Sequence, residues 1–286
     1  MQPTSKRILK LVWAGIAALL ITVIIGGIWT GLHITNLATS PAIPWAVIVM
    51  GLLLWLGWQY GNGRWRPART STARRRNMRA TPLSPRIFIW AVVAGLLSIG
   101  ALTGFWIVLS QLVTIPGNPL PDFSRYPWLS VGLVLFMASL VGAVTEEAAF
   151  RGYFQSLLER EVSGPVAILI MAVAIAPGHG VTQGFVWPTL LFYFFVDAMF
   201  GVTAYLTKSI LPGVVTHTIG LLVFFTLIWP NDSTRRLVSQ GGADTWFWIH
   251  VVQVILFTLL AILAFRHLAK VIGRKPAAQG RVEPEF

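Results

Sequence analysis

The chain contains no cysteine, which excludes disulfide bonds, thiolate nucleophiles and cysteine ligands to a metal. Charged residues are also scarce, at 11% of the total, and only 10 of the 286 residues are acidic. The zinc-binding pattern His-Glu-x-x-His is absent, and we find no internal repeat and no soluble module. Apolar residues dominate instead, at 55% with a mean hydropathy of +0.70, which is typical of a membrane protein.

Long apolar runs predict an all-α, polytopic membrane helical bundle. The hydrocarbon core of a bilayer is about 30 Å thick, so a helix needs about 20 apolar residues to cross it. Eight runs are candidates for membrane helices, at residues 8–32, 42–60, 87–113, 128–158, 164–179, 185–206, 210–229 and 246–268. The run at 164–179 is short for a span, so seven crossings are an alternative to eight.

The distribution of positive charge predicts the topology. Eight arginines lie between residues 64 and 86, and lysines and arginines flank both ends of the chain. Because such residues accumulate on the cytoplasmic side, we expect a multi-pass cell-membrane protein with both termini in the cytoplasm. The net charge of +12 is then explained by topology and by contact with anionic lipid, not by nucleic-acid binding. The first run is longer than a signal-peptide core and is expected to be retained.

We expect three parts along the chain. Residues 1–86 form an N-terminal two-helix membrane segment followed by the basic loop, which has the composition of a solvated connection. Residues 87–268 form the membrane-embedded core, and residues 269–286 form a polar tail.

Two adjacent acids, Glu146 and Glu147, lie inside an apolar run. A carboxylate there costs about 2.5–3.5 kcal/mol on insertion scales, so it usually lines a cavity, pairs with a cation or takes part in chemistry. In a regular helix over 128–158, Glu147 and Arg151 share one face, whereas Glu146 is rotated by about 100° from Glu147. We therefore expect Glu147 to pair with Arg151, and Glu146 to meet groups from other helices at membrane depth.

Three more polar residues lie in other apolar runs. His179 and His217 are candidates to meet Glu146 in a buried cavity. The neighbouring Pro177-Gly178 and Pro212-Gly213 permit broken helices, which are tolerated at membrane depth where they line a cavity. Asp197 is expected either to contact substrate or water, or to pair with a cation such as Lys208.

A carboxylate and two imidazoles around a wet cavity suit hydrolysis. Glu146 could take a proton from water as a general base, while His179 shares that water or donates a proton to the leaving group. Alternatively, Glu146, His179 and His217 could bind a divalent metal such as zinc, with one position open for water. The sequence leaves both mechanisms open.

Ordered motifs in this region resemble those of the CAAX prenyl protease and bacteriocin-processing (CPBP, or Abi) family of intramembrane endopeptidases. Residues 146–152, Glu-Glu-Ala-Ala-Phe-Arg-Gly, are similar to its Glu-Glu-x-x-x-Arg motif. His179 occupies the histidine position of its Phe-x-x-x-His motif, and His217 that of its His-x-x-x-Asn motif. The likeness covers about residues 128–230, including the segment 200–212 that leads into the third motif.

The resemblance implies a type II CAAX prenyl endopeptidase with Glu146, His179 and His217 as catalytic residues and Glu147 and Arg151 in support. It also implies a membrane-associated substrate, either a prenylated CAAX-type protein or a bacteriocin-like peptide, with membrane lipid as the other partner. No cofactor follows from it beyond the divalent metal considered above.

Two positions depart from the family motifs. Ile175 stands at the aromatic position of the second motif, where an apolar residue can pack. Leu221 stands at the Asn position of the third, whose side chain is expected to stabilise the oxyanion or orient water. Losing one such donor slows other enzymes by about 10²–10³-fold, unless another donor such as Thr216 or Thr218 replaces it.

Leu221 therefore supports an alternative, a catalytically degenerate member that binds a peptide or partner in immunity or scaffolding. A third hypothesis is a transporter with Glu146 and Asp197 as proton-coupled groups. It would be favoured by inverted repeats, which we do not find.

Overall fold

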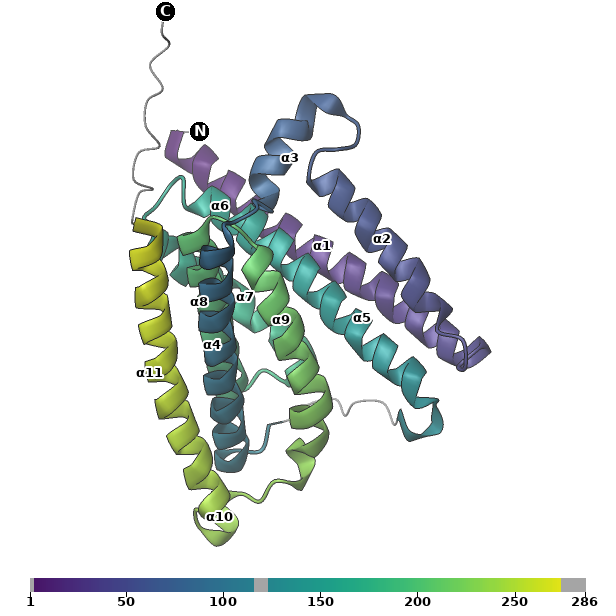
Figure 1. Cartoon of the computed structure of the whole chain (residues 1–286), viewed down its shortest axis with the longest axis vertical. Coiled ribbons are helices and arrows are strands. Elements are labelled where there is room, and N and C mark those ends of the chain that lie inside the picture. Colours follow the sequence, from purple (N-terminus) through teal and green to yellow (C-terminus); the bar gives the residue numbers. More distant parts are fainter. Residues whose placement is uncertain (1–2, 116–122, 274–286) are drawn as a thin grey trace, which may run out of the picture.

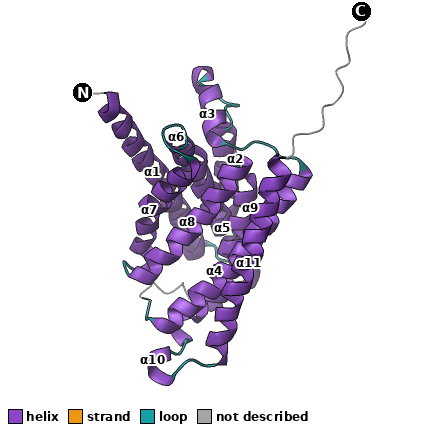
Figure 2. Ribbon diagram, turned by 90° about the vertical axis from the view of Figure 1, so that its left-hand side faces the viewer, coloured by secondary structure: helices purple, strands orange, loops and turns teal. Residues whose placement is uncertain are grey.

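The computed structural model describes residues 3–115 and 123–273, and every regular element in these ranges is helical (Figures 1 and 2). The α-helices are α1 (Pro3–Thr39), α2 (Trp45–Gly61), α3 (Ser71–Met78), α4 (Pro85–Leu112), α5 (Trp128–Glu146), α6 (Gln155–Leu158), α7 (Gly164–Gln183), α8 (Trp187–Thr207), α9 (Leu211–Val223), α10 (Val238–Gly241) and α11 (Thr245–Gly273). Two π-helical segments, η3 (Glu147–Phe154) and η4 (Phe224–Ile228), continue α5 and α9. Short 3₁₀ turns are η1 (Ala68–Thr70), η2 (Phe123–Arg125) and η5 (Trp229–Thr234).

Seven helices of the described residues are long and apolar enough to cross a membrane. They confirm a multi-pass, all-helical membrane protein, but they correct the expected lengths of two helices. The run expected at 164–179 continues to Gln183, so α7 has 20 residues. Helix α2 is the short one, because Pro44 precedes its start at Trp45 and leaves only 17 residues. It spans about 25 Å at 1.5 Å per residue and runs back beside α1 (Figure 1).

The N-terminal pair of helices packs against the core through two apolar clusters. Ala14 and Ala18 of α1 are buried with Phe150 and Phe154 of η3. Met50 of α2 is buried with residues of α1 and α5 in a second cluster. The first two helices are therefore attached along the element that carries the two glutamates.

Helices α4 and α11 pack closely against each other at glycine residues of α4. A Cβ atom at Gly100 would be 2.4 Å from the Phe257 ring, and one at Gly104 would be 3.1 Å from Gln253. Gln253 also donates a hydrogen bond to the Gly100 carbonyl at 2.8 Å. Small side chains at four-residue spacing allow such close approach in membrane helices.

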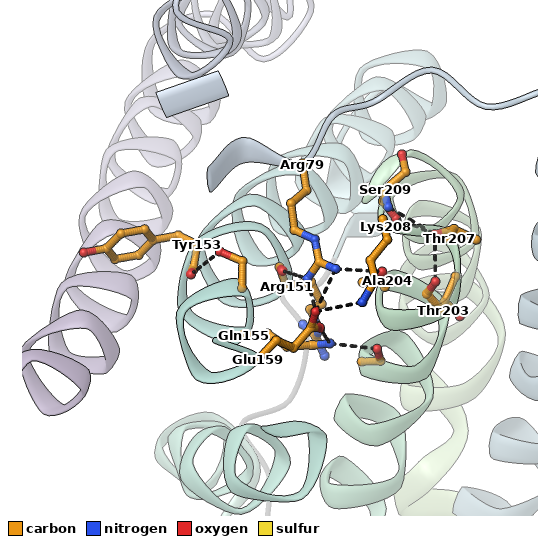
Figure 3. Close-up of polar contacts among 12 residues, drawn as sticks. Arg79, Arg151, Tyr153, Gln155, Glu159, Thr203, Ala204, Thr207, Lys208 and Ser209 are labelled. Carbon is orange, nitrogen blue, oxygen red and sulfur yellow. Dashed lines mark hydrogen bonds and ion pairs between the residues drawn. The ribbon is translucent and has the colours of Figure 1, made fainter. Parts of the chain in front are cut away.

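The basic loop is not simply a solvated connection, because it contains α3 and is bonded to the core where α3 ends (Figure 3). The buried side chain of Arg79 donates to both carboxylate oxygens of Glu159 at 3.1 Å. It also donates to the carbonyls of Arg151 and Ala204. The Arg79 carbonyl in turn accepts from the Ile210 amide at 3.0 Å. One arginine of the loop thus links α3 to η3, α6 and α8.

This link predicts an acid-sensitive contribution to stability. Burial by itself raises the pKa of Glu159, but hydrogen bonds and charge from Arg79, with hydrogen bonds from Gln155 and Lys208, outweigh it and lower the pKa. A lowered pKa in the folded state means that the stabilisation is complete above the ordinary value of 4.5 and is lost as pH falls through the folded value. We expect the thermal midpoint in detergent to fall with pH below 4.5 more steeply for wild type than for Glu159→Gln. Equal pH dependence of the two proteins would contradict this prediction.

Candidate active site

A cavity of about 1510 Å³ lies inside the bundle, bordered by residues of α4, α5, α7, α8 and α9. Glu146, His179 and His217, the three residues selected from the sequence, all line it. They come from α5, α7 and α9 respectively. Tyr193 and Leu221 line the same cavity.

His217 lies between the two glutamates. Its Nδ1 atom is 3.2 Å from Oε1 of Glu147, and its Nε2 atom is 3.8 Å from Oε2 of Glu146. An ionised carboxylate only accepts hydrogen bonds, so the contact with Glu147 places a proton on Nδ1 and directs Nε2 towards Glu146. The distance from Nε2 to Glu146 is too long for a direct hydrogen bond, and a water molecule between polar groups at such a distance can bridge them.

Glu147 and Arg151 form the pair that their spacing predicts, with Oε1 of Glu147 3.5 Å from Nη1 of Arg151. Arg151 also binds Asp197 of α8, at 2.5 Å from Nη2 to Oδ1. All three side chains are at most 1% exposed. Oε1 of Glu147 therefore joins the cation of Arg151 to the imidazole of His217, and Arg151 has two carboxylate neighbours.

Asp197 lies behind the cavity wall. It is buried against Arg151 and is not among the residues that line the cavity. Lys208, which the sequence suggested as a cation near Asp197, binds Glu159 instead, at 3.0 Å. In this structure Asp197 therefore contacts a guanidinium and not the space that a substrate would occupy.

The helix that carries the glutamates is not regular, contrary to the prediction of a continuous α-helix over 128–158. Residues Glu147–Phe154 form a π-helix, which begins immediately after Glu146. Single π-helical turns inside α-helices are rare and frequently occur at functional sites. The rotation of about 100° between Glu146 and Glu147 still separates them enough for Glu146 to line the cavity while Glu147 is buried.

Aromatic rings hold both imidazoles. The His217 ring stacks on Phe200, with ring centres 4.4 Å apart, and the guanidinium of Arg151 lies 5.3 Å from the centre of the Phe200 ring. The His179 ring stacks on Tyr193 at 3.7 Å with an angle of 4° between the planes. The aromatic residues come from one face of α8, since positions 193, 197 and 200 follow the i, i+4, i+7 spacing of a helix.

The helix breaks that the Pro-Gly pairs permit are not present at these two positions. Helix α7 continues through Pro177 to Gln183, and Pro212 lies in the first turn of α9. Proline is tolerated in a first turn because the amide hydrogen that it lacks has no partner there. Gly213 has a different role, since a Cβ atom at this position would lie 2.5 Å from Oε2 of Glu147. Its lack of a side chain lets α9 approach the glutamate.

The donor set fits a metal ion only in part. His217, with one nitrogen held by Glu147 and the other directed towards Glu146, has the arrangement of a histidine ligand supported by a carboxylate. Across the described residues, however, no group of three or more histidine or acidic side chains is placed to hold a metal. The set Glu146, His179 and His217 does not form such a group among the described residues.

The two departures from the family motifs have different surroundings. Ile175 is buried in the apolar cluster around Phe150 and Phe154, as expected for a packing residue. Leu221 lines the cavity and offers no hydrogen-bond donor. The suggested replacements do not point there, because Thr216 donates to the Pro212 carbonyl and Thr218 to the Val214 carbonyl.

Sequence reasoning assigned no role to Tyr193, Phe200 or Arg79. The sequence does contain a pattern that could have pointed to Tyr193 and Phe200. Their spacing from Asp197 places both aromatic residues on the same helix face as this intramembrane acid. Arg79 carried no such signal, because it lies among seven other arginines between residues 64 and 86.

The fold and the cavity define a class of protein, a multi-pass helical membrane protein with glutamate and histidine side chains gathered inside the bundle. Residues 128–223 match the family model described as Type II CAAX prenyl endopeptidase Rce1-like, and this segment is a domain of that family. The match contains both glutamates, Arg151 and the two cavity histidines. The family model that matches describes an endopeptidase family. A search of curated proteins and a search of solved structures found no match.

Proposed function

We propose that the protein is an intramembrane endopeptidase that hydrolyses a peptide bond in a membrane-associated protein or peptide. One observation carries the proposal: Oε2 of Glu146 and Nε2 of His217 face each other across 3.8 Å at the wall of a large cavity. That spacing leaves space for the attacking water between a general base and a second polar group. The family domain supports the same reaction class.

In this mechanism Glu146 removes a proton from water as the oxygen attacks the carbonyl carbon. His217 Nε2, which carries no proton in this tautomer, accepts a hydrogen bond from the same water and orients it, while Glu147 holds the ring in this tautomer and orientation. The proton held by Glu146, or one from His179, then passes to the amide nitrogen. The C–N bond breaks to give a carboxylate and an amine.

The test is cleavage of quenched peptides by the purified protein in detergent. Peptides with and without a prenyl group separate the two substrate types that the family implies. We expect turnover by wild type and strong loss in Glu146→Gln and His179→Ala.

Leu221 provides the observation that favours a second candidate function. A cavity wall without the family's amide donor suits a protein that binds peptide and does not cleave it. No turnover by wild type, with peptide still bound and with binding unaffected by Glu146→Gln, would establish this second function.

Replacing Leu221 by the asparagine of the family motif tests whether the missing amide donor limits catalysis. If the protein is a peptidase that lacks one oxyanion donor, Leu221→Asn is expected to raise kcat by up to about 10²-fold, because deletion of such donors costs about 10²–10³-fold. The two side chains are similar in size, so packing changes little. Leu222→Asn is the matched control on the neighbouring position. A decrease in kcat in Leu221→Asn, with the protein still folded, would contradict a role for this position in the reaction.

A further inference from the structure

The cavity extends from the candidate site towards one end of the bundle. Beyond the glutamates and histidines, its wall includes Trp106 and Ser110 from the last turns of α4, and Asp232, Arg235 and Gln240 from the segment after α9. The end of α4 and the segment before α11 lie at the end of the bundle that carries α10 (Figures 1 and 2). Gln240 is exposed there. The cavity therefore reaches solvent at this end.

The opposite end of the site is closed by buried ion pairs. Glu147, Arg151 and Asp197 lie next to His217 and are at most 1% exposed. Arg79 covers them on the side of α3, because it donates to the Arg151 carbonyl and to Glu159 (Figure 3). A substrate could pass this end only by separating these buried charges, which is strongly unfavourable.

The two ends differ in charge. Eight arginines lie between residues 64 and 86, at the closed end. The described loop residues at the cavity end, 113–115, 123–127 and 230–245, together contain three arginines and two aspartates. Since lysine and arginine accumulate in cytoplasmic loops, the closed end is the cytoplasmic one. The cavity then opens on the extracytoplasmic face.

We propose, on the basis of the proposed function, that the protease takes its substrate from the extracytoplasmic side of the membrane. The substrate is then an exported or surface-exposed peptide segment, not a cytoplasmic prenylated protein. The cavity wall indicates its chemistry, because Trp106, Phe192, Phe224 and Trp229 line the route and suit apolar or aromatic side chains. The ion pair of Asp232 and Arg235 lies in the same wall and provides polar contacts.

Cysteine labelling tests the direction of the opening, because the chain has no cysteine of its own. Thr72→Cys places a thiol on exposed α3, and Gln240→Cys places one on exposed α10. With a membrane-impermeant maleimide on intact cells, we expect labelling of Gln240→Cys and labelling of Thr72→Cys only after permeabilisation. The reverse pattern would overturn the proposal.

A third variant tests whether the cavity itself is reached from that side. Ala138→Cys lies in the cavity wall, and Ala91→Cys, at a fully buried position of α4, is its control. A small charged thiol reagent outside the cell is expected to modify the first and not the second. Modification of Ala138→Cys only from the cytoplasmic side would overturn the proposal.

Turnover in vesicles of known orientation separates this inference from the proposed function. Quenched peptide is expected to be cleaved when it is on the same side of the vesicle membrane as Gln240. It is not expected to be cleaved when it is on the same side as Thr72. Cleavage only on the Thr72 side would overturn the route but support the peptidase. Cleavage on neither side would reject the peptidase, while the labelling pattern would still decide where the cavity opens.

Discussion

Glu146→Gln is expected to lower kcat for peptide hydrolysis by about 10²–10⁴-fold, which is the usual contribution of a general base. Glutamine has nearly the same shape as glutamate but cannot accept the proton from water. The side chain lines the cavity and lies 3.8 Å from His217, so the change should leave the buried ion pairs intact. The measurement is the rate of cleavage of a quenched peptide, with the thermal midpoint recorded in parallel.

Glu161→Gln is the matched control, because it makes the same chemical change at an exposed glutamate whose partner is Arg7 at 3.8 Å. Exposed pairs of this kind contribute little to stability. The control should keep wild-type turnover and midpoint. A folded Glu146→Gln protein with wild-type kcat would exclude Glu146 as the base.

Arg151→Met is expected to destabilise the protein by about 3–5 kcal/mol, the usual effect of removing one partner from a buried ion pair. Glu147 and Asp197 would lose their common cation, and both are almost fully buried. Methionine keeps the unbranched apolar part of the side chain, so the effect reports mainly on charge. The measurement is thermal or denaturant unfolding in detergent.

Arg160→Met is its control, since Arg160 is exposed and makes one hydrogen bond to Asn77. Adding Asp197→Asn to Arg151→Met should recover part of the loss, because it removes one of the two uncompensated carboxylates. An equal effect from Arg160→Met, or no recovery in the double variant, would contradict the ion-pair explanation.

The helical membrane class and the candidate site residues could be predicted from sequence because each depends on local pattern. Long apolar runs must form helices in lipid, where every backbone amide needs a partner within the segment. Glu147 and Arg151 are four residues apart, so helix geometry alone brings them together. His179 and His217 are polar residues inside apolar runs that also match known motifs, and both line the cavity.

Partners from different helices could not be predicted in this way. Asp197 is 46 residues from Arg151, and Glu147 is 70 residues from His217. Arg79, one of eight arginines in the basic loop, is 80 residues from Glu159. The spacing of residues within one helix does not show which face of a second helix packs against them. These contacts therefore follow only from the packing of the helices.

The sequence by itself determined the class of protein, most of the apolar segments long enough to cross the membrane and the side chains available for chemistry, because these depend on hydropathy and on composition. Only the tertiary structure decided that Asp197 binds Arg151 and lies outside the cavity, and that a π-helix follows Glu146. It also decided that buried charges close one end of the site while the cavity reaches the other. The physical reason is that burial and charge pairing depend on how several helices pack together.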